Sequence, residues 1–401
     1  MDAVFPALLR IAVVTETYPP EVNGVARTIG MMVEGLLERG HFIQLIRPRQ
    51  HRHDEGDKRA GLETLLKASI PLPKYQELRM GLPAKRALMA AWRIRRPDVV
   101  QVVTEGPLGS SALAAAKRLG VPVISEFHTN FHTYSKHYGF GFLMPVVAAY
   151  LKRLHNRGDR TLVPTEEMKE RLRTVGYRHL DVVGRGIDAE TFHPGRRNEG
   201  LRTEWQADAR DPVVLHVGRL APEKNLRLFV ESVCAMHVVN PKLRVVMVGD
   251  GPERGPLQAA HPEFVFSGMR LGIDLATHYA SADLFLFPSQ TETFGNVTTE
   301  AMASGLAILA YDYAAAGQYL SHRESGLLAP YGNAAAFVEL AQEMVASPGA
   351  RERMGRNAAQ LAQTLTWPRV IDQLEGVLYD LAGAIPLAAF STETRKAHAT
   401  A

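Results

Sequence analysis

Short apolar runs alternate with longer amphipathic stretches along most of the chain. In the first half, the short aliphatic runs predict buried strands, and a periodicity of about 3.6 residues predicts helices between them. The strands are expected at residues 10–15, 42–46, 99–103 and 121–125, and the helices at residues 25–39 and 108–119. A glycine that suits a helix C-terminus follows each helix, Gly40 and Gly120 respectively. Strands that alternate with helices predict a parallel sheet with helices on both faces.

The same pattern restarts in the second half of the chain. Residues 194–212 are rich in charged and turn-forming residues and are expected to form a linker. A second series of strands is expected at residues 213–217, 243–248, 264–266, 284–287, 307–309 and 326–328. The fold class is therefore α/β, with two Rossmann-like domains that meet near residue 190. Because ligands of open α/β sheets bind at the carboxyl ends of the strands, a site is expected in a cleft between the domains.

Composition narrows the class of protein. Of 401 residues, 46% are hydrophobic and 22% are charged, which excludes a disordered, a collagen-like or a disulfide-rich chain. The one cysteine, Cys234, lies in an apolar run and is expected to be a buried thiol. No apolar run has the length of a membrane span, and the first residues lack the cationic start of a signal peptide. A cytoplasmic location is therefore expected.

Charge is divided unevenly between the two halves. Residues 1–195 hold 28 Lys and Arg against 20 Asp and Glu, a net charge of +8. Residues 196–401 hold 18 against 22, a net charge of −4. This asymmetry suggests that the two halves meet different partners.

Two of the segments that follow strands could bind an anion. Residues 15–24 end in Gly24 at the start of a predicted helix, where free N–H groups favour an anion. An ordinary strand-to-helix turn is an equally good interpretation. Residues 217–225 place Gly218, Arg219 and Lys224 on one loop, and two cations in that position suit a diphosphate. Two solvated surface cations would give the same pattern.

A third segment, residues 248–255, contains Gly249 and Gly251 but does not predict a nicotinamide site. The third glycine of the dinucleotide-binding fingerprint would fall at Arg254, and no acidic residue stands in the right register after the following strand. A tight strand-to-helix turn explains the two glycines.

Residues 288–305 carry the most distinctive pattern. Glu292 and Glu300 are eight residues apart around the start of a predicted helix. Carboxylates accept hydroxyl hydrogens, which suits sugar and ribose diols. The N–H groups of Phe294, Gly295 and Asn296 stand where the helix begins and would point at the same ligand.

Metal chemistry is not expected. His128, His132 and His137 follow a predicted strand, but they form no HExxH pattern and have no third ligand nearby. The chain contains no Asp-x-Asp pair, which argues against a carboxylate-bound Mg²⁺ or Mn²⁺. We expect His128 to be a polar residue of the cleft, and we expect no metal or other cofactor.

Taken in order, these segments resemble the retaining family 4 glycosyltransferases of the GT-B fold. The resemblance rests on TETYPPEVNGV, EFHTN, VGRLAPEKN, VGDGP, ADLFLFPSQTETFGNVTTEAMASG and ESGLLAP, which span residues 11 to about 330. More narrowly, the chain resembles bacterial GDP-mannose-dependent α-mannosyltransferases and their relatives that glycosylate lipids. The resemblance implies an acceptor-binding domain at residues 1–190 and a nucleotide-sugar-binding domain at residues 191–367. It also implies a helix within residues 368–401 that packs back on the first domain, followed by a frayed tail.

The resemblance also implies roles for single residues. Arg219 and Lys224, next to Gly218, would bind the donor diphosphate and stabilise its charge as it leaves, and Glu300 would bind the ribose. The donor sugar would lie against Glu292, the backbone of Phe294, Gly295 and Asn296, and His128. Gly24 would close on the phosphate, and Met269 would lie beside the base. The catalytic set would then be His128, Arg219, Lys224 and Glu292. Where many relatives carry a glycine pair, this chain has YDYAAAG at residues 311–317.

The implied reaction transfers a sugar with retained anomeric configuration, and the leaving phosphate is thought to help deprotonate the acceptor. The best guess is mannose from GDP-mannose, transferred to a lipid or lipid-linked acceptor. A UDP-sugar-dependent glucosyl- or glucuronosyl-type diacylglycerol glycosyltransferase is the alternative. A sugar-nucleotide epimerase, a phosphorylase-like enzyme and a non-catalytic sugar-nucleotide-binding protein are minor alternatives. No nucleic-acid partner is expected.

Two basic stretches bear on the acceptor. Residues 85–96 carry five cations around Leu88, Met89, Trp92 and Ile94, and residues 140–160 join an apolar run to four cations. Such helices suit an anionic membrane surface, which predicts a peripheral location on its inner face. Two ordinary helices with a solvated basic face are the competing interpretation.

Overall fold

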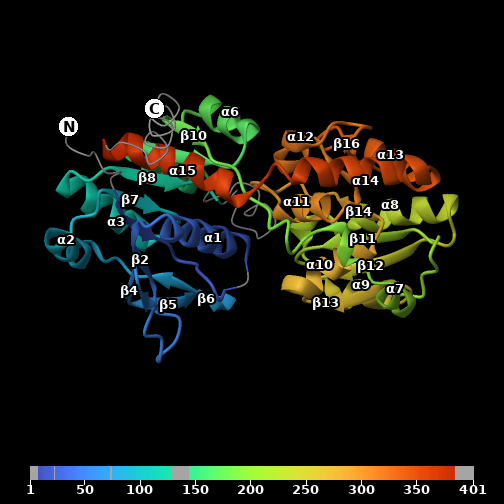
Figure 1. Ribbon diagram of the computed structural model, residues 1–401, viewed down its shortest axis with the longest axis horizontal. Helices are drawn as coiled ribbons and strands as arrows, with labels where there is room; N and C mark the ends of the chain where they lie inside the picture. The colour runs from blue at the N-terminus through green and yellow to red at the C-terminus, as the bar shows by residue number, and fades with distance from the viewer. Residues whose placement is uncertain (1–7, 22, 73–74, 129–143, 384–401) are drawn as a thin grey trace, which may run out of the picture.

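The computed structural model describes residues 8–21, 23–72, 75–128 and 144–383. Figure 1 shows two lobes side by side, each built on a largely parallel sheet. Each strand expected from the sequence is present, with its ends shifted by at most two residues. The expectations for His132, His137 and the tail beyond residue 383 lie outside the described residues.

The first sheet has the order β10-β9-β8-β7-β1-β2-β4-β3, and its neighbours are parallel except β3 and β4. One of its faces packs on α1 and α15, and the other packs on α2 and α3. Strands β5 and β6 form a separate antiparallel pair. The strands are β1 (Arg10–Val14), β2 (Phe42–Pro48), β3 (Lys58–Arg59), β4 (Leu62–Lys67), β5 (Ser69–Leu72), β6 (Tyr75–Gly81), β7 (Val99–Val102), β8 (Val123–Glu126), β9 (Arg160–Val163) and β10 (Leu180–Val182). The helices are α1 (Gly24–Glu38), α2 (Lys85–Ile94), α3 (Pro107–Leu119), α5 (Met144–Arg157) and α6 (Glu166–Thr174).

The second sheet has six parallel strands in the order β13-β12-β11-β14-β15-β16. Its strands are mostly apolar and buried because helices cover both faces. The strands are β11 (Val213–Val217), β12 (Arg244–Val248), β13 (Val265–Gly268), β14 (Leu284–Phe287), β15 (Ala307–Tyr311) and β16 (Leu327–Ala329). The helices are α8 (Leu226–Val239), α9 (Arg254–Ala260), α10 (Gly272–Ser281), α11 (Asn296–Ala303), α12 (Ala314–Tyr319), α13 (Ala334–Ala346) and α14 (Pro348–Ala362), with a short η3 (Pro222–Lys224).

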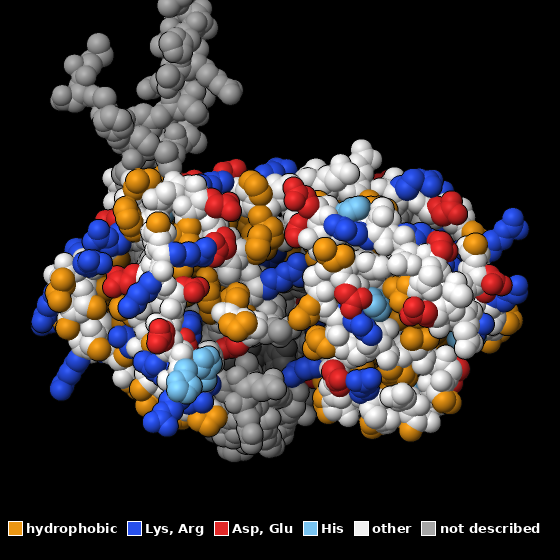
Figure 2. Space-filling view, turned by 60° about the horizontal axis from the view of Figure 1, so that its bottom comes forward, with side chains coloured by type: hydrophobic (Ala, Val, Ile, Leu, Met, Phe, Trp, Pro, Cys, Tyr) orange, Lys and Arg blue, Asp and Glu red, His pale blue; other side chains and the backbone are white. Residues whose placement is uncertain are grey.

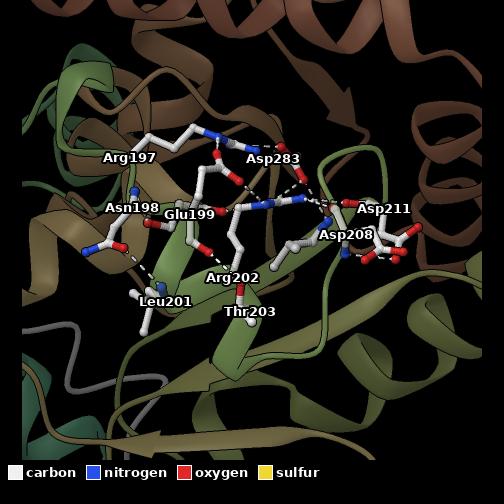
Figure 3. A network of polar contacts seen from close by, with 11 residues as sticks. Arg197, Asn198, Glu199, Leu201, Arg202, Thr203, Asp208, Asp211 and Asp283 are labelled. Atoms are coloured by element: carbon white, nitrogen blue, oxygen red, sulfur yellow. Dashed lines mark hydrogen bonds and ion pairs between the residues drawn. The ribbon is translucent and has the colours of Figure 1, made fainter.

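The expectation of a linker at residues 194–212 is wrong. This segment contains η2 (Pro194–Arg196) and α7 (Glu199–Glu204), and it packs into the second domain. Arg202 is 1% exposed; it donates to the Asp211 carbonyl at 2.8 Å and pairs with Asp283 at 3.1 Å (Figure 3). Polar composition misled the prediction because Arg202 and Asp211 are buried and satisfied inside the fold, although most other charged residues of the segment are exposed.

The two domains are joined where two segments run side by side. Ile187 forms a β-bridge with Thr366, and its N–H donates to the Leu365 carbonyl at 2.7 Å. Beyond this crossing, α15 (Trp367–Ala382) leaves the second domain and lies along the first, against α1 (Figure 1). Ile371 and Leu374 of α15 are buried in the core of the first domain.

The expectation of a buried thiol at Cys234 is also wrong, because Cys234 is exposed. Helix α8 buries Phe229, Val233 and Met236 on one face. Cys234 follows Val233 by one residue and is therefore turned about 100° away from that face.

Candidate active site

Each sheet has one point where the strand order reverses. In the first sheet this switch point lies between β1 and β7, and in the second it lies between β11 and β14. Loops that leave the two strands of a switch point diverge and form a crevice at the strand ends. In the second domain, the loop after β11 carries Arg219 and Lys224, and the loop after β14 carries Glu292. The structure thus brings together the residues predicted to hold a diphosphate and a sugar.

Lys224 and Glu292 form the centre of this site. The Lys224 ammonium lies 2.5 Å from Oε1 of Glu292, which also accepts from the Ser289 hydroxyl at 2.6 Å. Burial alone would raise the pKa of Glu292, but the Lys224 charge and these hydrogen bonds outweigh it and hold the pKa below its usual value. Glu292 is therefore a fixed anion beside a fixed cation.

Tyr313 holds the Glu292 loop in place through two hydrogen bonds. The Tyr313 hydroxyl accepts from the Glu292 N–H at 3.1 Å and donates to the Ser289 carbonyl at 2.8 Å. The next residue, Ala314, has a φ of 53°, in the left-handed region that favours glycine. The stretch for which the resemblance implies a glycine pair thus has a left-handed conformation at an alanine in this chain.

Arg219 lies on the loop that opens with Gly218, and its guanidinium contacts the carboxylate of Glu223. The backbone of this loop is packed against the turn after β12. A Cβ at Gly249 would overlap the Gly218 carbonyl, and one at Gly251 would overlap the Leu220 carbonyl. The two glycines therefore let two loops pack closely, and they lie in the strand-to-helix turn between β12 and α9 that was predicted for them.

Glu300 lies in the middle of α11 and is 4% exposed. One of its carboxylate oxygens contacts the Arg27 guanidinium, and the other accepts from the Tyr279 hydroxyl at 3.0 Å. Burial raises the pKa of Glu300 above its usual value, although Arg27 and Tyr279 act against it. In this conformation both oxygens have protein partners, and one partner comes from the first domain.

The first domain touches the second at three places around the site. Arg27 of α1 contacts Glu300 and stacks over the Phe192 ring at 5.3 Å. A Cβ at Gly24 would lie 3.6 Å from the Asn296 amide nitrogen, so the starts of α1 and α11 face each other. The cavity beside Glu300 measures about 10 Å³, which is about enough for one water molecule.

His128 makes the third of these contacts. Its carbonyl accepts from the Thr293 hydroxyl at 3.1 Å, next to Glu292. Its ring lies 2.8 Å from the Glu126 carboxylate through Nε2 and 3.3 Å from the Arg185 guanidinium through Nδ1. His128 thus stands at the interdomain contact, and its ring faces protein groups. Its place beside the donor sugar stays a prediction.

The remaining predicted residues lie around the same loops. Phe294 is 4% exposed, and its carbonyl accepts from the Ala315 N–H at 2.8 Å. Gly295 has a φ of 90° directly before α11, a conformation that glycine adopts freely. Met269 is 57% exposed beside β13, on the far side of β12 from Lys224.

Sequence reasoning missed several side chains of this site, chiefly Arg27, Tyr279, Ser289 and Tyr313. Arg27 had a usable signal: it lies three residues after Gly24, in the first turn of α1, where side chains lean back towards the helix N-terminus. No signal in the sequence pointed to Tyr279, because it reaches Glu300 from a different helix, α10. Within the part of the chain that the structure describes, His, Cys, Asp and Glu form no group of three that could hold a metal ion.

Two Rossmann-like domains that contact each other around the loop of Glu292 and the helix of Glu300 define a GT-B fold. Solved structures agree with this assignment of the fold. The sucrose-phosphate synthase of Thermosynechococcus elongatus is 18% identical and superposes with a TM-score of 0.73, covering 93% of this chain and 98% of that one. Anabaena HepE in complex with UDP-glucose is 17% identical with a TM-score of 0.70, covering 93% and 100%.

Sequence comparison identifies the family. The model described as Glycosyltransferase Family 4 matches residues 22–191, and that of Glycosyl transferases group 1 matches residues 211–347. A GDP-mannose-dependent alpha-mannosyltransferase of Mycobacterium tuberculosis is 35% identical over 92% of this chain and 96% of its own length. The chain belongs to glycosyltransferase family 4 and is a hexosyltransferase, which confirms the predicted family and fold. An alpha-monoglucosyldiacylglycerol synthase of Streptococcus pneumoniae is a more distant relative, 26% identical over 86% of this chain and 80% of its own length.

Among the described residues, the structure contains no helix that is both long and apolar enough to cross a membrane.

Proposed function

We propose that the enzyme transfers mannose from GDP-mannose, with retention of configuration, to a lipid or lipid-linked acceptor. The observation that carries the proposal is the Lys224–Glu292 pair beside Arg219 at the switch point of the second domain. It places cations where a diphosphate leaves and an anion where a sugar hydroxyl can donate. The similarity to mannosyltransferases of 30–35% identity, over at least 92% of this chain, supports mannose and GDP as the donor parts.

The chemistry assigns one task to each end of the site. The bond between the anomeric carbon and the diphosphate oxygen breaks, and a bond from the same carbon to the acceptor oxygen forms. The diphosphate takes the electron pair, and Arg219 and Lys224 stabilise the charge that develops on it. The proton of the acceptor hydroxyl goes to the departing phosphate. Electrostatic stabilisation of this kind is often the largest part of catalysis, and loss of one donor costs about 10²–10³ in rate.

The test is a donor screen with the purified chain and a lipid extract. GDP-mannose should raise the melting temperature and be consumed only when acceptor lipid is present, whereas UDP-glucose should do neither. Turnover of a UDP-sugar in place of GDP-mannose would favour the alternative donor. The similarity to alpha-monoglucosyldiacylglycerol synthases is the reason for testing that alternative. Consumption of the nucleotide sugar with no product on lipid would exclude transfer to a lipid.

We also propose that transfer needs no divalent metal, because Lys224 and Arg219 already supply positive charge at the diphosphate position. Turnover in excess EDTA should stay within about twofold of turnover in Mg²⁺. Complete loss in EDTA that Mg²⁺ or Mn²⁺ restores would contradict the proposal.

A peripheral position on the inner face of an anionic membrane, on the cytoplasmic side, completes the proposal. Helix α2 exposes Lys85, Arg86 and Arg93, and Ile94 beside them is 84% exposed. Figure 2 shows Lys and Arg side chains gathered at the outer end of the first lobe, the end that carries α2 in Figure 1. The expected apolar face of this helix needs correction, since Leu88 and Trp92 are buried in the core and leave only Ile94 for lipid.

Vesicle co-sedimentation tests this surface. Changing Lys85, Arg86 and Arg93 to Gln should weaken binding to anionic vesicles by about 100-fold, at roughly 1 kcal/mol for each cation. The matched control changes three exposed cations of the second domain, Lys242, Arg353 and Arg356, to Gln and should bind as the wild type does. Equal loss in both variants would mean that net charge, and not α2, attracts the vesicles.

A further inference from the structure

A buried polar cluster stands behind His128, and none of its other members was predicted from the sequence. Glu126 is the last residue of β8 and is fully buried, and Gln101 of β7 donates to its carboxylate. Arg185 lies on the segment that crosses between the domains and is 5% exposed. Both charged groups face the His128 ring, one at each nitrogen.

The partners define the protonation of the ring. A guanidinium can only donate, so the His128 Nδ1 that lies 3.3 Å from Arg185 Nη2 must accept and carries no proton. Nε2, which is left to carry the ring proton, lies 2.8 Å from the Glu126 carboxylate in an ion-pair contact that lacks hydrogen-bond geometry. Burial would raise the pKa of Glu126, but His128, Arg185 and Gln101 hold it below its usual value, so the Glu126 carboxylate is ionised. These contacts therefore hold the ring in one tautomer, with Nδ1 as the acceptor.

Because Nδ1 accepts from Arg185 and Nε2 is buried against the Glu126 carboxylate, the ring itself is not free to exchange a proton with a substrate in this conformation. What His128 presents to the second domain is its main chain, whose carbonyl accepts from Thr293 at 3.1 Å. Thr293 follows Glu292, which pairs with Lys224. Through His128, the buried cluster therefore contacts Thr293, the direct chain neighbour of the candidate sugar-binding carboxylate Glu292.

The second partner, Arg185, ties this arrangement to the crossing between the domains. Its guanidinium also donates to the carbonyls of Val183 and Gly184, at 3.2 and 3.1 Å. Two residues further on, Ile187 forms the β-bridge with Thr366 that joins the two crossing segments. A side chain rooted in the crossing segment therefore fixes the orientation of a ring at the interdomain contact.

We propose that Glu126 and Arg185 are positioning residues, which lock the His128 ring so that its main chain holds the Thr293 loop in place when the domains are closed. The loop is the one that would hold the donor sugar, so this part rests on the proposed function. Loss of either partner should lower kcat while the affinity for GDP, whose diphosphate is assigned to Arg219 and Lys224, stays the same.

The kinetic test uses Arg185→Met, Arg185→Lys and Glu126→Gln in the full chain. Arg185→Met and Glu126→Gln should lower kcat at least tenfold with a Kd for GDP within twofold of wild type, and Arg185→Lys should recover part of the rate because it keeps a charged donor. Thr293→Val should lower kcat to a similar extent. The control is Arg173→Met, on the exposed face of α6, which should behave as wild type. Wild-type kcat in either Arg185→Met or Glu126→Gln would overturn the proposal, and so would parallel losses of kcat and GDP affinity.

A second measurement does not depend on any donor. Nitrogen NMR of ¹⁵N-histidine-labelled protein, with the His128 signals assigned by a His128→Gln variant, should show one protonated and one unprotonated ring nitrogen. Arg185→Met should shift the Nδ1 signal, and Thr293→Val should not. Two results would refute the locked tautomer: a wild-type ring that is doubly protonated near neutral pH, or an Nδ1 signal that does not shift in Arg185→Met. If no nucleotide sugar is turned over, the proposed function fails, and the NMR result still decides this inference.

Discussion

At the scale of single residues, Glu300 gives the most direct test of the donor site. Its carboxylate is buried, and a ribose diol that replaces Arg27 and Tyr279 would bind both oxygens. Glu300→Ala should weaken GDP binding by about 5- to 150-fold, the equivalent of about 1–3 kcal/mol for buried hydroxyl partners. Calorimetric titration with GDP measures it, and Glu339→Ala on the exposed side of α13 is the control. Wild-type GDP affinity in Glu300→Ala would remove the ribose assignment.

The ionisation of Glu16 should make the stability of the folded protein depend on pH. It follows β1 at the switch point of the first sheet, where the Leu108 N–H donates to it at 3.3 Å. Burial, aided by Glu105, raises its pKa from 4.5 to about 7. The unfolded chain therefore releases this proton at a lower pH than the folded protein does. Stability is lost as the pH rises from about 4.5 through about 7.

Glu16→Gln should remove that loss, because the amide cannot ionise. Above pH 8 the variant should be more stable than wild type by about 1–3 kcal/mol, a range that allows for partial solvent screening of the carboxylate. At pH 4 the two proteins should be equally stable. Urea unfolding at several pH values checks this, with the exposed Glu55→Gln as control. Parallel stability profiles for wild type and Glu16→Gln would contradict the prediction.

At the scale of elements, the crossing of α1 and α15 holds the C-terminal helix on the first domain. Gly35 of α1 lies at this crossing, and a Cβ there would stand 2.6 Å from Cγ1 of Ile371. Gly376 of α15 has nothing within 4 Å of its Cβ position. Gly35→Ala should therefore destabilise the protein by about 1–3 kcal/mol through overpacking. Gly376→Ala should stabilise it by about 0.5–1 kcal/mol through helix propensity. Thermal unfolding of both variants is the measurement, and stabilisation by Gly35→Ala would mean that the helices separate readily.

The helices and strands also show which parts of the fold can be predicted from sequence patterns. The buried strands were predictable because parallel strands covered on both faces are continuous apolar runs, as in β14 and β15. The segment around Arg202 was not predictable, because its composition is that of a loop and its partner Asp283 lies 81 residues away. The same limit applies to the site. Glu292 and Glu300 were found from their spacing, whereas Arg27 meets Glu300 only after the two domains are placed face to face.

At the scale of the whole molecule, the contact between Arg27 and Glu300 joins the two domains at the proposed ribose site. The Glu300 side chain is 5% exposed and the Arg27 side chain 42%, so the pair lies at the rim of the interdomain contact. The adjoining cavity of about 10 Å³ is far smaller than a nucleotide. A ribose that binds Glu300 must therefore displace Arg27, and the domains must separate to admit it.

Arg27→Met should relieve that competition while keeping the aliphatic part of the side chain against Phe192. The association rate of GDP should rise and its affinity should increase about fivefold, the equivalent of about 1 kcal/mol for a half-exposed ion pair. Arg27→Lys, which keeps the charge, should lie between the variant and wild type. Without nucleotide, small-angle scattering should give Arg27→Met a larger radius of gyration than wild type, since one of the contacts that close the domains is gone. Weaker GDP binding in Arg27→Met would show instead that Arg27 binds the nucleotide, and Glu300 would then act by orienting Arg27 rather than by meeting the ribose.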